Sequence, residues 1–231
     1  MQYSCDYAYL PKIGLLGGTG DLGQALAVNL YKGFNEILVG SRNIEKAESA
    51  VKDMNSDKKN HDLERMLTPA TNELVVEESD VIIVTIPHEN AVETVRSLVN
   101  KFRGNQLLIS AVAPVVKEGN EFRFAMPTQS SSISEAISQL VMNTVEVATA
   151  FQTIPARVLY SGREISADVL ICAPEKTYSR VADIVNQING LRPLYVGSLR
   201  LAAEIESLTA LLLNIALRNH MKTPTFKLNS F

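Results

Sequence analysis

The stretch Ile13-Gly14-Leu15-Leu16-Gly17-Gly18-Thr19-Gly20-Asp21-Leu22-Gly23 decides how the rest of the chain is interpreted. A short apolar run ends in a glycine cluster, and an alternating apolar and polar segment follows over 24–31. This order predicts a strand, a tight turn and a helix. Gly18, Gly20 and Gly23 match G-x-G-x-x-G, whose glycines form the turn, admit a pyrophosphate and let the helix pack against the strand. Because N–H groups at a helix start attract anions, the stretch predicts a dinucleotide site.

The composition narrows the class of protein. The chain has 231 residues, of which 46% are hydrophobic, so it has enough apolar side chains for a full core. A net charge of -3 gives no reason to expect nucleic acid or a membrane surface as a partner. Cys5 and Cys172 are far apart, and His61, His88 and His220 share no spacing, so we expect neither a disulfide nor a metal site. With no secretory signal and no apolar stretch of about 18 residues, we expect a cytoplasmic protein.

The second strand, expected over 36–40, ends in a set of residues that suits a phosphate. An acidic residue at this point usually holds the ribose 2′-hydroxyl of NAD. Here Ser41 offers a hydroxyl, Arg42 offers a planar cation, and Lys46 follows one turn into the next expected helix, 44–54. The set predicts recognition of a 2′-phosphate, and therefore NADP rather than NAD. The alternative is an ordinary helix start with surface cations.

Strands and helices then alternate, which predicts a doubly wound parallel sheet of the Rossmann type. We expect strands at Glu64–Thr68, Val81–Thr85 and Gln106–Ser110, and helices at Asn72–Glu78 and His88–Val99. Ligands of such sheets bind beyond the carboxyl ends of the strands. The apolar loops 85–88 and 111–114 are therefore expected to be walls of the cofactor site, although a proline that only ends a strand is the alternative for each.

The rest of the chain predicts a smaller α/β part that completes the sheet. We expect an NADP-binding domain over 1–150 and a C-terminal domain over 151–231. The expected segments are an irregular stretch Phe122–Ser132, a helix Ser134–Val141, strands Val145–Phe151 and Asp168–Cys172, a helix Pro174–Ile188, a crossing segment Leu191–Val196 and a helix Leu199–Asn219 capped by Ser198. The section 208–217 is apolar nearly all round, so it should be buried in a core or against another subunit.

The sequence shows no acid, base or nucleophile that we can assign to catalysis. It lacks a Ser-His-Asp arrangement, paired carboxylates in an apolar setting, a G-x-x-x-x-G-K-S/T motif and a suitably placed Tyr-x-x-x-Lys. A hydride that passes between two cofactors needs no such group. It needs two rings stacked with the reacting carbons about 3–3.5 Å apart, which is catalysis by positioning.

Segments along nearly the whole chain resemble the F420-dependent NADP oxidoreductases, which pass a hydride between NADPH and a deazaflavin. The segments that carry the resemblance are Leu16–Gly23, Val39–Arg42 with Lys46-Ala47, Thr85–Pro87, Pro114-Val115, Thr153–Ala156, Gly190–Leu194, Glu206–Thr209 and Leu213–Ile215. The Gly-Leu-Arg-Pro-Leu and Glu-Ser-Leu-Thr segments are more specific than the glycine loop. The resemblance implies a homo-oligomer, commonly a dimer, whose C-terminal helices help to build the interface.

The resemblance also implies roles for individual residues. Residues 19–22, which are Thr19, Gly20, Asp21 and Leu22, would wrap the pyrophosphate, and Ser41, Arg42 and Lys46 would hold the 2′-phosphate. The NADP side would be lined by Ile86, His88, Val92, Val112, Ala113 and Ala156. The deazaflavin F420 would lie over the nicotinamide, near Pro114, Ile154, Pro155 and Leu208. Asp21, His88 and Gln152 stand where the family pattern leads us to expect Asn, Trp and His.

Two other functions fit the same sequence. One is an NADPH-dependent reductase of another acceptor, such as a flavin, a ferric chelate or a small imine, because the same fold serves those reactions. The other is a non-catalytic sensor that binds NADP(H). Bleaching of oxidised F420 by NADPH would separate the deazaflavin enzyme from both.

Overall fold

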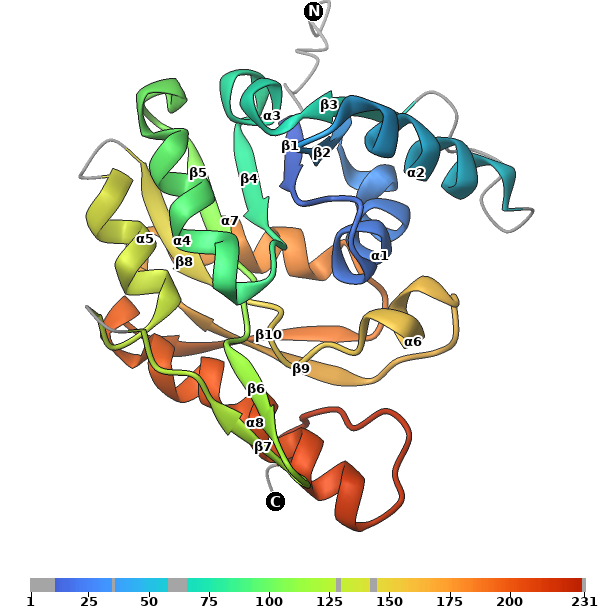
Figure 1. Ribbon diagram of the computed structural model, residues 1–231, viewed down its shortest axis with the longest axis vertical. Coiled ribbons are helices and arrows are strands. Elements are labelled where there is room, and N and C mark those ends of the chain that lie inside the picture. The colour runs from blue at the N-terminus through green and yellow to red at the C-terminus, as the bar shows by residue number, and fades with distance from the viewer. Residues whose placement is uncertain (1–10, 35, 58–65, 128–129, 142–144, 230–231) are drawn as a thin grey trace, which may run out of the picture.

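The computed structural model describes residues 11–34, 36–57, 66–127, 130–141 and 145–229. Within these ranges an eight-stranded sheet has the order β10-β9-β8-β5-β4-β1-β2-β3, with helices on both of its faces (Figure 1). Neighbouring strands are parallel except β8 and β9, which pair antiparallel at Thr149 and Cys172. The structure confirms the predicted α/β class with a doubly wound, mostly parallel sheet.

The strands of the large sheet are short, and its central strands are buried. The strands are β1 (Ile13–Leu16), β2 (Ile37–Ser41), β3 (Leu67–Thr71), β4 (Val81–Val84), β5 (Leu107–Ser110), β8 (Glu146–Thr149), β9 (Ala167–Cys172) and β10 (Leu191–Gly197). Every residue of β1, β4 and β5 is buried. Helices cover both faces of these central strands, so near-continuous apolar runs are the pattern that parallel strands require.

The described helices, apart from α8 (Ala202–Arg218), divide into two layers, each with its own core. They are α1 (Asp21–Leu30), α2 (Ile44–Ser56), α3 (Asn72–Glu78), α4 (His88–Ser97), α5 (Ile133–Val141), α6 (Ala156–Tyr160) and α7 (Glu175–Asn186). The first core packs α1, α2, α6 and α7 on one face of the sheet, and the second packs α3, α4 and α5 on the other. Among the helices described, none has the length and apolar character needed to span a bilayer.

A hairpin replaces part of the stretch 122–132 that was expected to be irregular. Strands β6 (Val115–Glu118) and β7 (Glu121–Phe124) pair antiparallel around a two-residue turn, in which Gly119 has a φ of 58°. Such a turn requires positive φ, which glycine adopts without strain. Asn214 of α8 accepts a hydrogen bond from the backbone N–H of Phe122 at 2.9 Å and donates one to its carbonyl at 2.6 Å. The hairpin therefore depends on a contact with a helix 92 residues away.

Four further expectations need correction. The segment 191–197 is a full strand, β10, because β9 offers it a parallel partner. The edge strand β3 spans Leu67–Thr71 and so continues past the expected end at Thr68, and an edge tolerates Pro69. Residues 64 and 65 of the expected strand lie outside the described ranges. Helix α6 was not predicted. The hydroxyl of Ser198 makes no capping hydrogen bond, since a 3₁₀ turn, Leu199–Leu201, precedes α8.

Some expectations concern residues that the structure does not describe. Cys5 and His61 lie outside the described ranges. Cys172 is a free thiol with no exposed surface, and burial raises its pKa to about 12. The division of the chain at residue 150 stays a prediction, and the large sheet continues across it through β9 and β10.

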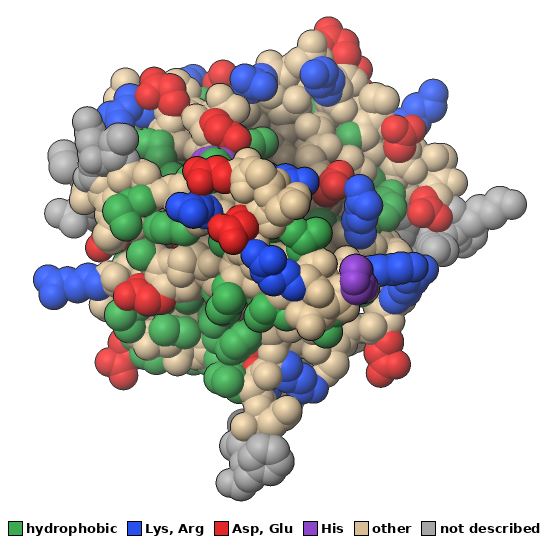
Figure 2. Space-filling model, turned by 60° about the horizontal axis from the view of Figure 1, so that its bottom comes forward, with side chains coloured by type: hydrophobic (Ala, Val, Ile, Leu, Met, Phe, Trp, Pro, Cys, Tyr) green, Lys and Arg blue, Asp and Glu red, His purple; other side chains and the backbone are tan. Residues whose placement is uncertain are grey.

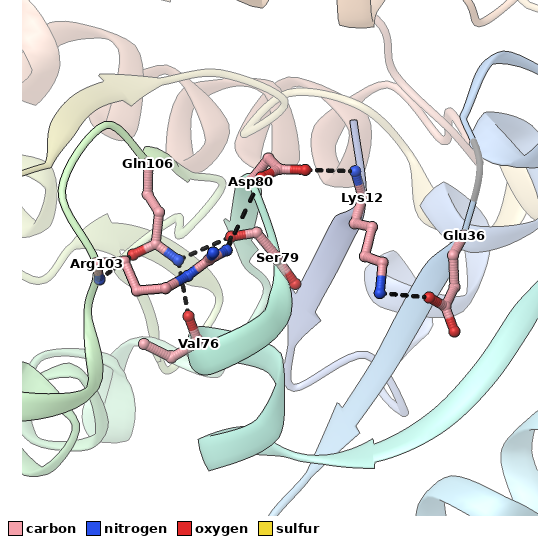
Figure 3. A network of polar contacts seen from close by, with 7 residues as sticks. All are labelled: Lys12, Glu36, Val76, Ser79, Asp80, Arg103 and Gln106. Atoms are coloured by element: carbon pink, nitrogen blue, oxygen red, sulfur yellow. Dashed lines mark hydrogen bonds and ion pairs between the residues drawn. The ribbon is translucent and has the colours of Figure 1, made fainter. Parts of the chain in front are cut away.

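A polar network joins the amino ends of the central strands (Figure 3). The side-chain amide of Gln106 donates to the carbonyls of Val76 and Ser79, both at 2.7 Å, and accepts from the N–H of Arg103 at 2.6 Å. Asp80 accepts from the N–H of Lys12 at 2.9 Å, and the Lys12 ammonium lies 3.1 Å from the carboxylate of Glu36. These bonds hold β1, β2, β4 and β5 together at the end of the sheet opposite the expected ligand site.

The chain's last described residues are tied to β9 and β10 through one carboxylate. Asp168 is fully buried and accepts two hydrogen bonds from the Arg192 guanidinium, both at 2.8 Å. It also accepts from the N–H of Leu228 at 2.6 Å, and its own N–H donates to the carbonyl of Phe226 at 2.8 Å. Hydrogen bonds from Arg192 are the main reason that the pKa of Asp168 lies below its usual value.

Replacing Asp168 with Asn should lower the free energy of unfolding by about 1.5–3 kcal/mol at pH 7, because hydrogen bonds to a charged group are lost. A depressed carboxyl pKa stabilises the folded protein above the unfolded-state pKa of about 3.9, and this contribution disappears as the pH falls below it. Urea unfolding of the two proteins at pH 7 and below pH 4 measures the difference. If the difference in unfolding free energy between the two proteins does not shrink in acid, the Asp168 carboxylate is not the source of the stability. The control is Asp183→Asn, at an exposed position on α7.

Candidate functional site

A cleft opens beyond the carboxyl ends of β1, β2, β4 and β5. It has a volume of about 720 Å³. Its lining comes from the glycine loop, the β2–α2 turn, the start of α4 and the loop after β5. This is the position where doubly wound sheets bind ligands, because loops from adjacent parallel strands diverge there.

The glycine loop makes its turn one residue earlier than expected. Gly17, not Gly18, has the positive φ, 77°, and the sequence motif does not distinguish the two. The N–H of Gly18 donates to the carbonyl of Leu15 at 3.1 Å, and the N–H of Gly20 donates to that of Gly17 at 3.0 Å. A Cβ on Gly20 would have no neighbour closer than 3.5 Å, so the backbone beside Gly20 is open. That opening leaves the space which a pyrophosphate needs.

Gly23 has a strict steric role. A Cβ at this position would lie 2.6 Å from the Cα of Gly18, which is closer than any real contact. The third glycine of the motif therefore permits close packing, as predicted, although the atoms that it meets belong to Gly18 of the glycine loop and not to β1. Gly20 precedes α1 without any side-chain capping bond, so the N-terminus of α1 keeps its backbone donors beside the cleft.

The end of β2 presents the expected cations. Ser41 is buried, and its hydroxyl accepts from the N–H of Asn43 at 3.2 Å, which shapes the turn. Asn43 caps α2 by accepting from the N–H of Lys46 at 3.0 Å. Arg42 and Lys46 are both exposed and line the cleft. Among the described residues no carboxylate forms a salt bridge with either cation, so both remain available to an anion.

The opposite wall of the cleft is largely apolar. Ile86, Val112 and Ala113 line it, and Ile86 and Val112 are almost fully buried. The hydroxyl of Thr85 is turned away from solvent and donates to the carbonyl of Leu16 at 3.0 Å. His88 begins α4, and its Nδ1 lies 3.5 Å from the carboxylate of Glu89. Such a wall suits a flat, uncharged ring and keeps water away from one of its faces.

The structure brings together ten of the residues that the sequence singled out. Those that line the cleft are Thr19, Gly20, Asp21, Ser41, Arg42, Lys46, Ile86, His88, Val112 and Ala113. Gly18, Leu22, Val92, Pro114, Ala156, Ile154, Pro155 and Leu208 do not line it. Of these, Ala156 lines a second cavity of about 340 Å³, which shares Asp21 with the cleft. Binding by any of these residues stays a prediction.

Sequence reasoning missed several residues that line the cleft. They are Asn43, Asn72, Glu89, Asn90, Thr94 and Val115. Asn72 is buried, and its side-chain oxygen accepts from the N–H of Gly17 at 3.5 Å, so it supports the glycine loop from 55 residues away. No local pattern predicts a contact of that range. Asn43 could have been found, because an Asn just before a helix is a common cap.

The C-terminal helix reaches this region through two anchors. The hydroxyl of Thr209 donates to the carbonyl of Gln152 at 3.0 Å, in the loop after β8. The fully buried carboxylate of Glu206 accepts from the N–H groups of Ile133 and Ser134, both at 2.9 Å, and from the Ser134 hydroxyl at 2.7 Å. Burial raises the pKa of Glu206, and the bonds from Ser134 and Ile133 oppose that shift. Leu208 lies between these two anchored residues in the sequence of α8.

A family model described as "NADP oxidoreductase coenzyme F420-dependent" matches residues 12–114. The F420-dependent NADP reductase of Methanocaldococcus jannaschii is 31% identical over 213 residues, which cover 91% of this chain and 95% of that protein. The F420-dependent NADP reductase of Methanothermobacter marburgensis is 30% identical, and the match covers 95% of this chain and 98% of that protein.

A solved structure from Arthrobacter sp. FB24, described as an F420-dependent NADP-reductase, shares the fold. Its TM-score is 0.74 at 15% identity, and the match covers 96% of this chain and all of that one. At this identity the likeness concerns architecture alone, and it agrees with the sheet and helix layers described above.

Replacing Gly23 with Ala should destabilise the protein by about 1–3 kcal/mol, because the new methyl group meets backbone atoms that cannot move separately. Gly104→Ala is the matched control, since a Cβ there would have nothing within 4 Å, and we expect a change within about 0.5 kcal/mol. Urea unfolding measures both. Equal stability of the two variants would show that α1 can retreat from the loop without cost.

Proposed function

The chain belongs to the family of coenzyme F420-dependent NADP oxidoreductases, and on that basis we propose that it transfers a hydride between NADP(H) and the deazaflavin coenzyme F420. One observation about the site carries the proposal. A single cleft joins a helix N-terminus, two cations that form no salt bridge with any described carboxylate, and an apolar wall. These are the features needed for a pyrophosphate, a 2′-phosphate and a nicotinamide ring respectively.

We assign the adenosine end of NADP to the β2–α2 turn. The guanidinium of Arg42 and the ammonium of Lys46 would hold the 2′-phosphate, with the hydroxyl of Ser41 beside them. The backbone of residues 19–22 would hold the pyrophosphate through N–H groups at the start of α1. The open space beside Gly20 supports this assignment, because no side chain occupies the place where the phosphates must approach the backbone.

The residues of this chain would contribute to the reaction by placing two rings. NADPH supplies the hydride when it is bound, and the deazaflavin accepts it. Ile86, Val112 and Ala113 would support one ring and exclude water from it, while Pro114, Ile154, Pro155 and Leu208 would lie on the acceptor side. No proton has to be moved by a side chain during a direct hydride transfer, so correct spacing is the main requirement.

Mixing the protein with NADPH and oxidised F420 tests the function. We expect loss of the deazaflavin absorbance together with oxidation of NADPH. If NADPH binds and F420 keeps its absorbance across the pH range, the proposal is wrong. Turnover of a flavin, a ferric chelate or an imine would then identify a different reductase, and binding without any turnover would indicate a sensor.

Replacing Arg42 with Ala should weaken NADPH binding by roughly tenfold to a hundredfold, since charge-assisted hydrogen bonds contribute about 1.5–3 kcal/mol. Binding of NADH, which has no 2′-phosphate, should change little. Calorimetric titration with both coenzymes measures the preference. Arg96→Ala on α4 is the control, because that exposed guanidinium pairs with Glu93 at 3.2 Å outside the cleft. An unchanged preference in Arg42→Ala would place the phosphate elsewhere.

We further propose a homodimer formed through α8. The sequence predicted that 208–217 is buried in a core or against another subunit. In the single chain Leu211, Ile215 and Leu217 are 55%, 40% and 45% exposed, so the core does not cover them. Leu211 and Ile215 are four residues apart and share one face of the helix. Figure 2, which brings this side of the molecule forward, shows hydrophobic side chains grouped among charged ones. An exposed apolar ridge of this kind favours a second copy as its cover.

Replacing Leu211 with Glu should raise the dimer dissociation constant at least about thirtyfold, because each copy would place a charge in an apolar interface. Sedimentation equilibrium measures it. Leu74→Glu is the control, since Leu74 is 40% exposed on α3, away from α8. If the wild-type protein is a monomer, or if both variants dimerise like the wild type, α8 is not the interface.

We also propose a cytoplasmic location, with small coenzymes and a second copy as partners. The free, buried Cys172 supports a reducing compartment. The net charge of -3 favours neither nucleic acid nor an anionic membrane surface.

A further inference from the structure

Two neighbouring strands end beside the two sides of the proposed hydride-transfer site. β5 leads into 111–113, on the nicotinamide side, and β8 leads into 151–155, on the acceptor side. The strands are parallel, with Ser110 opposite Thr149, so both loops leave the same edge of the sheet (Figure 1). Any contact between these loops affects how far apart the two rings are held.

The side chain of Gln152 makes such a contact. It is buried, with 6% of its surface exposed, and its amide nitrogen donates to the carbonyl of Ser110 at 2.7 Å and to the hydroxyl of Thr149. Because a carbonyl only accepts hydrogen bonds, the nitrogen must face Ser110. Gln152 thus connects the loop after β8 to the last residue of β5.

The sheet itself does not need this bond. The carbonyl of Ser110 already accepts from the N–H of Ala150 at 3.1 Å and from the Thr149 hydroxyl at 3.3 Å. The side-chain oxygen of Gln152 is buried and has no hydrogen-bond partner among the described residues. A buried amide with one unsatisfied end is costly for the fold, so its presence calls for a reason other than stability.

The backbone around Gln152 is also unusual. Phe151 has a φ of 76°, a conformation that bulky side chains rarely adopt, yet its ring is buried in the core with 1% exposed. Its carbonyl accepts from the N–H of Ile154 at 3.1 Å, and the Gln152 carbonyl accepts from the Thr209 hydroxyl at 3.0 Å. Strained backbone that is held from several sides is common where a functional loop must keep one shape.

We propose that Gln152 is a positioning residue for hydride transfer, whose amide sets the place of the acceptor-side loop 153–155 relative to the nicotinamide-side segment 111–113. It acts through the two loops and need not touch either ring. The inference rests on the proposed function. A displacement of about 1 Å in such a site can slow a reaction about a hundredfold, so one hydrogen bond at this junction can control the rate.

Gln152→Met tests the inference, because it keeps the size of the side chain and removes both the amide donor and the unsatisfied oxygen. We expect the single-turnover rate of hydride transfer to fall about tenfold to a hundredfold. The affinity for NADP should stay within about threefold, since the phosphate-binding residues lie on other loops. The melting temperature should stay within a few degrees, because Ser110 keeps its other two donors.

A second measurement needs neither coenzyme. In the free protein, the amide of Ile154 should exchange with solvent at least about tenfold faster in Gln152→Met, while the amide of Ile109 within β5 should be unaffected. Thr177→Val is the control. It removes a buried hydroxyl that donates to Glu146 at 3.2 Å, at the end of β8 opposite the loop, so we expect the transfer rate and the Ile154 exchange to remain within about threefold of the wild type.

Gln152→His keeps a side-chain N–H that can donate to Ser110, so its transfer rate should be close to that of the wild type. This variant tests the inference even if Gln152→Met folds poorly. Unchanged transfer and unchanged Ile154 exchange in Gln152→Met would overturn the positioning role while the proposed function stands. Wild-type protein that fails to bleach F420 would overturn the function itself, and the exchange measurement would still decide whether Gln152 holds the loop.

Discussion

The contact between α1 and the glycine loop governs the geometry of the whole ligand-binding end. Gly23 lies against Gly18 with no room for a Cβ, and Gly17 makes the reversal that brings the loop to this position. Backbone-to-backbone packing of this kind has little freedom to slide, because no flexible side chain separates the two surfaces. The N-terminus of α1 is therefore aimed at the cleft by sterics, before any ligand contributes.

The two ends of the sheet have opposite characters. At the amino end, Gln106 and Asp80 satisfy backbone groups of adjacent segments, and the Lys12 ammonium pairs with Glu36, so that the strands are joined (Figure 3). At the carboxyl end, the loops separate and leave a cleft with exposed cations on one side and apolar residues on the other. Rigid support at one end allows the other end to remain open, and the proposed coenzyme site uses that opening.

The C-terminal helix connects the two halves of the fold. Glu206 loses hydration when it is buried, and the N–H groups at the start of α5 replace it. Thr209 then fixes the loop after β8, and Asn214 fixes the hairpin β6–β7. One face of α8 is thus committed to polar contacts within the chain, while Leu211 and Ile215 on another face stay exposed and suit a second copy.

The sequence alone determined the class of fold, most of the strands and which side chains the turn after β2 presents, because apolar periodicity and glycine spacing are local properties of the chain. The exact match of α3 at 72–78 and the correct start of β1 at Ile13 depend on such local signals. Only the tertiary structure decided which glycine reverses the chain, that Asn72 supports the loop, that 115–124 forms a hairpin on α8 and that Gln152 bonds to Ser110. Each of these depends on a partner between 42 and 92 residues away or on crowding by a distant segment. No local pattern encodes them, since the chain must fold before those atoms meet.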